Sequence, residues 1–333
     1  MAELKLYRHK DLENLISTRN CETKFGEKLG FVKSVDELKK SAAKFVLLGI
    51  PEDIGVKANY GKSGAAGAWK AALKALVNIQ YNQFNQAENV IVLGELDCSK
   101  EMAKAGNIDL KDPNYYAKLG DLVKQIDLEL ANIIEKITAA GKTPIIIGGG
   151  HNNAYGNIKG AAKGLNQPLN VVNIDAHSDL RMLEHRHSGN GFSYAIEGGF
   201  LRKYVIFGLH KNYTPEYIFE EMKSDNIDFK LFEDLIREPE KVNQQFKSSL
   251  EFVADSKFGL ELDCDVIANF PSSAQSPTGF SIEQIRNFIN FASKSQNYSY
   301  FHICEAAPTN LNETQVGKAI AYFISDFISN SSA

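Results

Sequence analysis

The chain has little cysteine, no long apolar run and no excess of positive charge, and each absence removes a class of protein. Its four cysteines, Cys21, Cys98, Cys264 and Cys304, are far apart and form no CxxC pair. This argues against a disulfide framework or a zinc ribbon. No segment approaches the roughly 20 apolar residues of a membrane helix, and residues 1–15 lack the apolar core of a secretory signal. We therefore expect a cytoplasmic protein that does not enter a membrane.

The net charge of −4 gives no electrostatic reason to bind nucleic acid or an acidic membrane surface. Nucleotide-binding motifs are also missing, since neither GxGxxG nor GxxxxGK[ST] occurs. The three glycines of "IIIGGGH" (residues 145–151) leave a phosphate-binding loop open as an alternative, which the missing motifs disfavour. The expected ligand is therefore a small molecule.

Short apolar runs alternate with longer amphipathic segments along the chain. Strands are predicted at "FVLLGI", "NVIVLGEL", "TPIIIGGG", "LNVVNID", "YVIFGLH", "FGLELD" and "YSYFHICE", and most are separated by helical patterns. Strands that are apolar on both faces indicate a mostly parallel sheet covered by helices on both sides. We predict an α/β fold, with residues 1–43 as a helical N-terminal extension and residues 44–330 as a single domain.

Metal-binding types of residue follow three of these predicted strands. They are His151 after "IIIGGG", then Asp175, His177 and Asp179 in "VVNIDAHSD", and Asp263 and Asp265 in "GLELDCD". Residues at i, i+2 and i+4 of an extended chain point to the same side, so each motif is expected to converge if its backbone stays extended. In open α/β sheets the ligand site lies beyond the carboxyl ends of the strands, where all three motifs would meet.

Four carboxylates at one buried site are very unfavourable without a cation. Two divalent cations would balance their charge, and oxygen ligands with some imidazole and no thiolate favour Mn²⁺. A pair of metal ions can lower the pKa of a shared water molecule, so the pattern indicates two-metal hydrolysis. A lone DxD is weak, because it also occurs in sugar-nucleotide transferases; three motifs at successive strand ends are much more specific.

At these residues the sequence resembles the ureohydrolase family of arginases, agmatinases and formiminoglutamases. The resemblance runs from "LLGIPEDIGV" to the last helix, with "GGGH", "DAHSD" and "LDCD" in the family's order. It implies a three-layer α/β/α sandwich and two Mn²⁺ per subunit. One ion would be held by His151, Asp175, Asp179 and Asp263, and the other by Asp175, His177, Asp263 and Asp265.

The resemblance also implies a mechanism for linear amidines and guanidines. A hydroxide that bridges the metals would attack the planar carbon of the substrate. Asp179 would orient this hydroxide and pass its proton to the leaving nitrogen, and Glu305 of "HICEAAP" would bind the substrate's cationic nitrogens. His187 lies near the family's active-site loop and is a candidate proton relay, although alignment on the following glycine places Ser188 there instead.

Three features favour the formiminoglutamase branch, which converts N-formimino-L-glutamate and water to L-glutamate and formamide. "EDIGVKANYGKSGAAG" resembles that branch's DxGVxxNxGRxGA loop and contains Asn59, and "GGGHNNAYG" resembles GGGHExAYG. Arg181 follows the last ligand of "DAHSD" where arginases usually have Asn, and a guanidinium there can pair with a substrate carboxylate. Arg181, Asn59 and Asn190 are the candidate substrate contacts, with a surface or interface role for Arg181 as the alternative.

Several departures keep other functions open. Lys57 and Lys62 stand where the branch usually has arginines, and "DCDVIAN" lacks the arginase DxDxxDP pattern. The alternatives are an agmatinase, a guanidinobutyrase or an arginase-like enzyme, and, from another class, a non-catalytic metal-binding regulatory member. A two-metal phosphoesterase is disfavoured, because no Arg/Lys phosphate clamp accompanies the ligands. By resemblance we also expect a homo-oligomer, either a trimer or a hexamer.

Overall fold

The computed structural model describes residues 2–329, and every strand in them belongs to one sheet. The sheet order is β1-β3-β2-β4-β9-β8-β5-β6-β7, and all neighbours are parallel except β1 and β3. The strands are β1 (Glu3–Leu6), β2 (Phe45–Gly49), β3 (Val90–Asp97), β4 (Thr143–Ile147), β5 (Leu169–Ile174), β6 (Leu201–Leu209), β7 (Ile227–Leu231), β8 (Phe258–Asp263) and β9 (Tyr298–Cys304).

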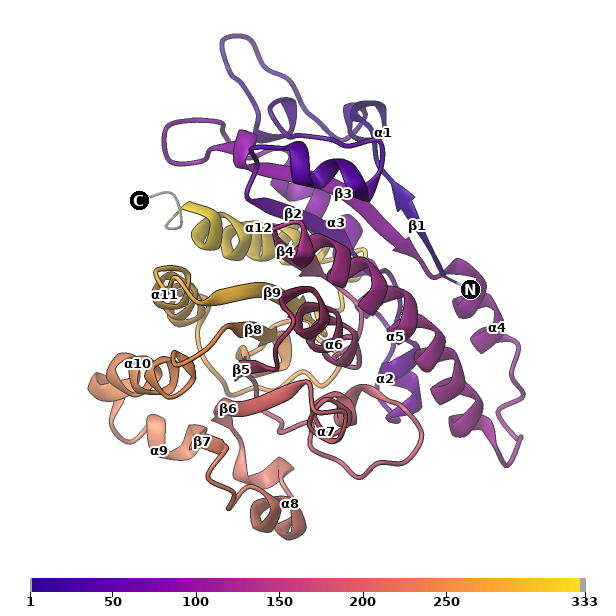
Figure 1. The fold of residues 1–333 in the computed structure, drawn as a ribbon, viewed down its shortest axis with the longest axis vertical. Helices are drawn as coiled ribbons and strands as arrows, with labels where there is room; N and C mark the ends of the chain where they lie inside the picture. The colour runs from indigo at the N-terminus through magenta and orange to yellow at the C-terminus, as the bar shows by residue number, and fades with distance from the viewer. Residues whose placement is uncertain (1, 330–333) are drawn as a thin grey trace.

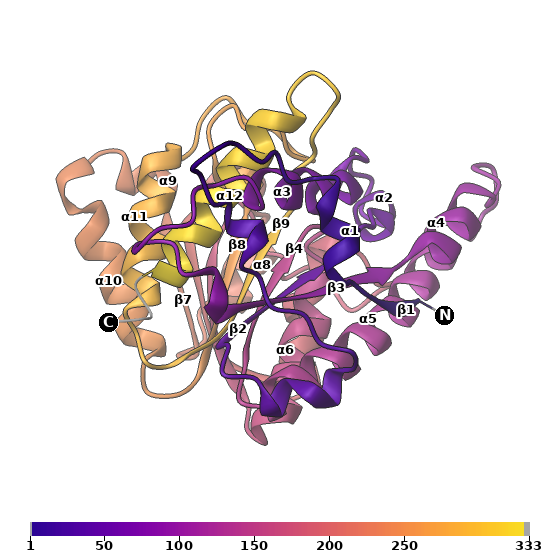
Figure 2. The same ribbon diagram turned by 90° about the horizontal axis from the view of Figure 1, so that it is seen from above.

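Helices cover both faces of this sheet (Figure 1). They are α1 (His9–Glu13), α2 (Ile54–Ala58), α3 (Ala68–Leu76), α4 (Ser99–Gly106), α5 (Tyr115–Ala139), α6 (Asn153–Leu165), α7 (Gly191–Glu197), α8 (Glu216–Glu221), α9 (Phe232–Leu235), α10 (Val242–Val253), α11 (Ile282–Ser293) and α12 (Glu313–Ser329). Seen from above, α10, α11 and α12 lie on one side and α5 and α6 on the other (Figure 2). The predicted α/β/α sandwich is confirmed.

Two hydrophobic clusters, one on each face, explain why the sheet is buried. Side chains of α3, α10, α11 and α12 pack on one face, and those of α5, α6 and α7 pack on the other. Strands β2, β4, β5, β8 and β9 are buried at every position, as expected for parallel strands covered on both sides. Within residues 2–329, no helix combines the length and the apolar character that crossing a bilayer requires.

The N-terminal segment differs from the prediction of a helical extension. Residues 3–6 form β1, which extends the sheet by pairing antiparallel with β3, and the helices that follow are short: α1 and two 3₁₀ helices, Phe25–Glu27 and Val35–Lys40. The sequence "ELKL" alternates exposed and half-buried positions, as an edge strand does. Gly94 of β3 permits this pairing, because it has φ +131° and a Cβ there would lie 2.0 Å from the Lys5 carbonyl oxygen. A single domain over residues 44–330 stays a prediction, and residue 330 lies outside the described residues.

Candidate metal centre

The four segments that carry the predicted metal ligands and Glu305 leave neighbouring strands. Strands β4, β9, β8 and β5 are adjacent in the sheet in that order. His151 follows β4, Glu305 follows β9, Asp265 follows β8 and Asp175 follows β5. Since these strands are parallel, their carboxyl ends meet at one edge and bring the residues together, at the position where ligands bind in open α/β sheets.

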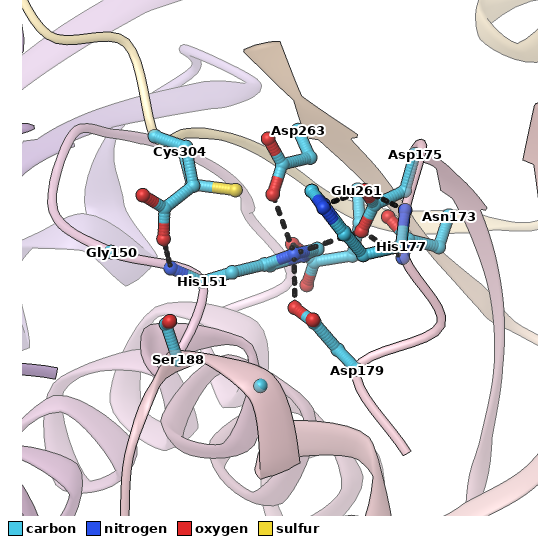
Figure 3. Close-up of polar contacts among 12 residues, drawn as sticks. Gly150, His151, Asn173, Asp175, His177, Asp179, Ser188, Glu261, Asp263 and Cys304 are labelled. Carbon is cyan, nitrogen blue, oxygen red and sulfur yellow. Dashed lines mark hydrogen bonds and ion pairs between the residues drawn. The ribbon is translucent and has the colours of Figure 1, made fainter. Parts of the chain in front are cut away.

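The inner part of the cluster surrounds the imidazole of His151, which is 1% exposed. Its Nδ1 lies 2.8 Å from Asp179 Oδ2, 3.1 Å from Asp263 Oδ2 and 3.2 Å from Asp175 Oδ2 (Figure 3). One ligand atom from each of these four residues lies within 4.8 Å of all the others. Three carboxylates and an imidazole at these distances fit a divalent cation among them.

The outer part of the cluster is formed by His177 and Asp265. His177 Nδ1 lies 3.6 Å from Asp175 Oδ1 and 3.9 Å from Asp265 Oδ2. Asp175 therefore presents one carboxylate oxygen to each imidazole. The structure brings all six predicted ligand positions together in two groups that share Asp175, which suits a pair of ions.

The metal ligands are brought together by short turns, whereas the prediction from the sequence required an extended backbone. Strand β5 ends at Ile174, the His177 amide donates to Asp175 Oδ1 at 2.8 Å, and Asp179 has φ +51°. Asp265 lies in a 3₁₀ turn, and its amide donates to Asp263 Oδ1 at 2.7 Å. Short turns stabilised by carboxylates thus replace the predicted alternation beyond each strand end.

Without a cation, the buried carboxylates of this cluster repel one another when they are ionised. Burial raises the pKa of Asp263, and the neighbouring charges of Asp175 and Asp265 raise it further. Burial opposes a charge on His177, but Asp175 and Asp265 nevertheless raise its pKa to about 10. Bound divalent cations would reverse this preference and keep the carboxylates ionised, with His177 neutral. The donor set therefore fits the predicted manganese pair.

Glu305 lies at the same strand-end edge, with its carboxylate between the cluster and a cavity. Its Oε1 accepts a hydrogen bond from the His151 amide at 2.6 Å, whereas its Oε2 is buried without a hydrogen-bond partner in residues 2–329. Burial and the charge of Asp265 raise the Glu305 pKa to about 8. The backbone at Glu305 has φ +60°, a left-handed conformation that is unusual for a residue with a side chain. Glu305 is also among the residues that line the cavity over the cluster.

A cavity of about 380 Å³ opens over the cluster. Side chains that line it include Asn59, His177, Asp179, Arg181, Tyr213 and Glu305. The Arg181 guanidinium donates to Asn59 Oδ1 at 2.6 Å, and Asn59 in turn donates to Ser188 Oγ at 3.1 Å. Two of the three predicted substrate contacts besides Glu305 therefore stand together on the cavity wall.

The remaining two predicted site residues, His187 and Asn190, do not line this cavity. The His187 Nδ1 accepts from the Gly189 amide at 3.1 Å, and its Nε2 lies 3.1 Å from Glu184 Oε1. Asn190 is fully buried, and its side-chain amide contacts Arg186 and the backbone of residues 182–187. Both side chains support the loop from inside it, so we propose neither as a catalytic or substrate contact.

Sequence reasoning missed residues that lie behind and beside the ligands. Asn173 donates to Asp175 Oδ2 at 2.9 Å, and Glu261 Oε2 lies 3.6 Å from His151 Nε2. Each stands on a strand, two residues before a ligand in the sequence, a spacing that could have identified them. Tyr213 stacks on His177, with ring centroids 5.2 Å apart; no sequence motif marks it.

Fold and cluster together define a class, namely α/β/α sandwiches with a carboxylate- and imidazole-rich cluster at the carboxyl ends of parallel strands. The model of the arginase family matches residues 43–329. The chain therefore belongs to the arginase family.

Relatives and solved structures agree with this assignment. The chain is 26% identical over 329 residues to formimidoylglutamase of Legionella pneumophila (strain Paris), covering 94% of this chain and 93% of the relative. It is 25% identical over 251 residues to formimidoylglutamase of Chromobacterium violaceum, covering 74% of each. The fold is similar to formimidoylglutamase of Bacillus subtilis, with a TM-score of 0.75, 17% identity and coverage of 95% and 94%. It is also similar to Trypanosoma cruzi formiminoglutamase with Mn2+2, with a TM-score of 0.73, 16% identity and coverage of 93% and 98%.

Proposed function

We propose that the protein is a manganese-dependent formiminoglutamase, which hydrolyses N-formimino-L-glutamate to L-glutamate and formamide. The observation that carries the proposal is a cation beside an acidic cluster: Arg181 lines the same cavity as Asp179 and Glu305. Within residues 2–329 its guanidinium contacts the neutral amide of Asn59 and no carboxylate pairs with it. The names of the curated relatives and the Mn2+2 of the Trypanosoma cruzi structure support the same function.

The two groups of ligands define the proposed ion positions. His151, Asp175, Asp179 and Asp263 would hold the inner ion, and Asp175, His177, Asp263 and Asp265 the outer ion. When bound, the pair supplies Lewis acidity and a water molecule of lowered pKa. Asp175 and Asp263 would contact both ions; both carboxylates are buried, Asp175 faces both imidazoles and Asp263 faces His151.

The protein's own groups would bind and orient the substrate. The free Oε2 of Glu305 accepts a hydrogen bond from the cationic formimino nitrogens, which also favours the ionised form of that carboxylate. Arg181 binds a substrate carboxylate as a charge-assisted pair, and Asn59 holds the guanidinium in place. Asp179 faces both His151 and the cavity, so it is placed to carry a proton to the leaving nitrogen.

The direct test is formamide release from N-formimino-L-glutamate by the manganese-loaded protein. We expect turnover on this substrate and no urea from arginine, agmatine or guanidinobutyrate, since none of these offers a glutamate-like pair of carboxylates to Arg181. Urea production from one of these compounds, without formamide release, would instead assign the protein to another branch of the family. Inactivity on the whole panel with two bound ions would favour a regulatory role.

Arg181→Ala tests the substrate contact itself. Loss of a charge-assisted pair of about 1.5–3 kcal/mol should raise KM roughly 10- to 100-fold with little change in kcat. Arg181→Lys is the matched control, because it keeps the charge without the planar fork and should fall between the two. An unchanged KM in the alanine variant would remove Arg181 from the site.

We also propose a cytoplasmic location and a homo-oligomer, either a trimer or a hexamer, from the resemblance to the family. Light scattering on the purified protein measures the oligomer, and a monomeric mass would contradict it.

A further inference from the structure

A second polar layer lies one pleat beneath the metal ligands. It consists of Asn173 on β5, Tyr204 on β6, Glu261 on β8 and Tyr300 and His302 on β9, all of them buried. Side chains two apart on a strand share a face, so Glu261 points to the same side as Asp263. Glu261 is also paired in register with His302 on the neighbouring strand. A face of the sheet that is otherwise apolar thus carries a carboxylate directly below the cluster.

The hydrogen bonds of Glu261 hold its carboxylate in one orientation. Tyr300 donates its hydroxyl to Oε1 at 2.7 Å, and His302 Nδ1 lies 2.5 Å from Oε2. A carboxylate only accepts, so the His302 Nδ1 must carry the proton. The same Oε2 lies 3.6 Å from His151 Nε2. Glu261 is therefore fixed from β9 and faces His151.

His151 has opposite requirements at its two nitrogens. Its Nδ1 faces three carboxylates and needs a free lone pair to bind a cation, so its Nε2 must carry the proton. Nε2 is fully buried and has no hydrogen-bond partner in residues 2–329. A donor in that position is costly unless an acceptor comes within reach, and Glu261 Oε2 is only slightly beyond hydrogen-bonding distance.

We infer that Glu261 is a positioning residue for the inner ion, fixing the tautomer and ring orientation of His151 through its Nε2 proton. The inference rests on the proposed metal centre and adds a residue from beyond its ligand set. Carboxylates that accept from the second nitrogen of a ligating histidine change metal affinity by roughly 10- to 100-fold. The effect should be confined to one of the two ions, because His177 has no contact with Glu261.

The same residues could suggest a third metal site, since His151, Glu261, His302 and Cys304 also come within 4.8 Å of one another. The contacts favour the positioning role instead. Both oxygens of Glu261 already accept hydrogen bonds, and the Cys304 thiol donates weakly to the Leu262 carbonyl oxygen at 3.6 Å. A thiol that keeps its proton is a poor ligand.

The experiment is a titration of the metal-free protein with Mn²⁺, with the electron paramagnetic resonance signal of free Mn²⁺ as the readout. The wild type should bind two ions. Glu261→Gln should weaken one of them about 10- to 100-fold and leave the other within about twofold. Tyr300→Phe is the matched control, because it removes one hydrogen bond to the same carboxylate and keeps its charge; it should change neither affinity more than a few-fold.

Other outcomes separate the possible failures. Two unchanged affinities in Glu261→Gln would overturn the inference alone, whereas a wild type without manganese would overturn the metal centre. A third ion in the wild type that Glu261→Gln abolishes would show that the layer is itself a metal site. If Glu261→Gln does not fold, His302→Gln replaces it: with the carboxylate less restrained, the same ion should weaken several-fold, and unchanged binding contradicts the positioning role.

Discussion

His151 and His177, the two imidazoles of the cluster, are held in different ways. His151 is 1% exposed, and its surroundings are the turns and strands of the sheet itself, with Glu261 behind it. The His177 side chain is 29% exposed and stacks on Tyr213 at the cavity wall, with ring planes 26° apart. Carboxylates at the strand ends and the edge contact with Phe192 thus surround the inner imidazole, whereas stacking on a loop tyrosine holds the outer one.

The outer arrangement continues away from the cluster. Tyr213 stacks on His210 with centroids 5.2 Å apart, and His210 stacks on Phe232 at 4.7 Å. These rings follow β6 or stand in α9, so they belong to the far end of the sheet. We therefore expect the affinities of the two ions to respond to separate substitutions, except where one residue contacts both imidazoles.

Asp175 is the carboxylate that contacts both imidazoles, and its removal should have the largest effect. Its two oxygens face His151 and His177, so Asp175→Ala should reduce bound manganese from two ions to none and abolish hydrolysis. Elemental analysis of the dialysed protein measures this. Asp121→Ala, at an exposed carboxylate of α5, is the control and should retain both ions. Two ions per chain in Asp175→Ala would end the assignment of Asp175 as the shared ligand.

A smaller effect is expected at Tyr213, confined to the outer ion. Aromatic stacking contributes about 0.5–1.5 kcal/mol, so Tyr213→Ala should weaken one manganese ion roughly 2- to 12-fold. Tyr213→Phe keeps the ring and should bind both ions as the wild type does. Calorimetric titration with Mn²⁺ distinguishes the two affinities. If Tyr213→Ala weakens the same ion as Glu261→Gln, the separation between inner and outer sides is wrong.

The smallest effect concerns His187, which contacts neither imidazole of the cluster. Burial, together with the charges of His185 and Arg181, lowers its pKa to about 4, whereas Glu184 opposes this shift. An unfolded histidine titrates near 6.5. As pH falls from 6.5 to 4, His187 therefore gains a proton in the unfolded chain and stays neutral in the folded protein. Stability should therefore decline through this window, and His187→Gln should flatten the decline.

Thermal unfolding of the two proteins between pH 7 and 4.5 provides the comparison, since all other groups titrate in both. Parallel curves would mean that His187 is not held neutral. The variant should also retain most of its hydrolytic activity; a loss at neutral pH far beyond the loss of folded protein would restore the proton-relay hypothesis.

The metal ligands could be predicted from the sequence because they stand where apolar strands end. Asp175 and Asp263 needed only a strand boundary and the rule for parallel sheets. The path that brings Asp179 back to His151 could not be predicted, since it depends on one residue with φ +51°. The short strand β1 was missed for a related reason: its four residues carry a weak pattern, and pairing with β3 decides their conformation.

The supporting residues were harder to predict than the ligands. Glu261 and His302 stand inside strands whose other residues are mainly apolar, and only the register between β8 and β9 places them side by side. Asn190 shows the converse case: this polar loop residue near the site was predicted to bind substrate, and in the structure its side chain is hydrogen-bonded to Arg186 and to the loop's own backbone. Whether a polar side chain is available to bind substrate depends on the contacts that it makes in the folded protein.

The left-handed backbone at Asp179 and Glu305 has one more consequence. A residue with a side chain held there costs of order 1–3 kcal/mol, a strain that glycine would relieve. Selection for thermostability alone would therefore favour glycine at both positions and, in doing so, discard the acids that face the cavity. A stabilised variant of this protein obtained by unguided screening is thus expected to carry its inactivating changes at the very edge where the sheet ends.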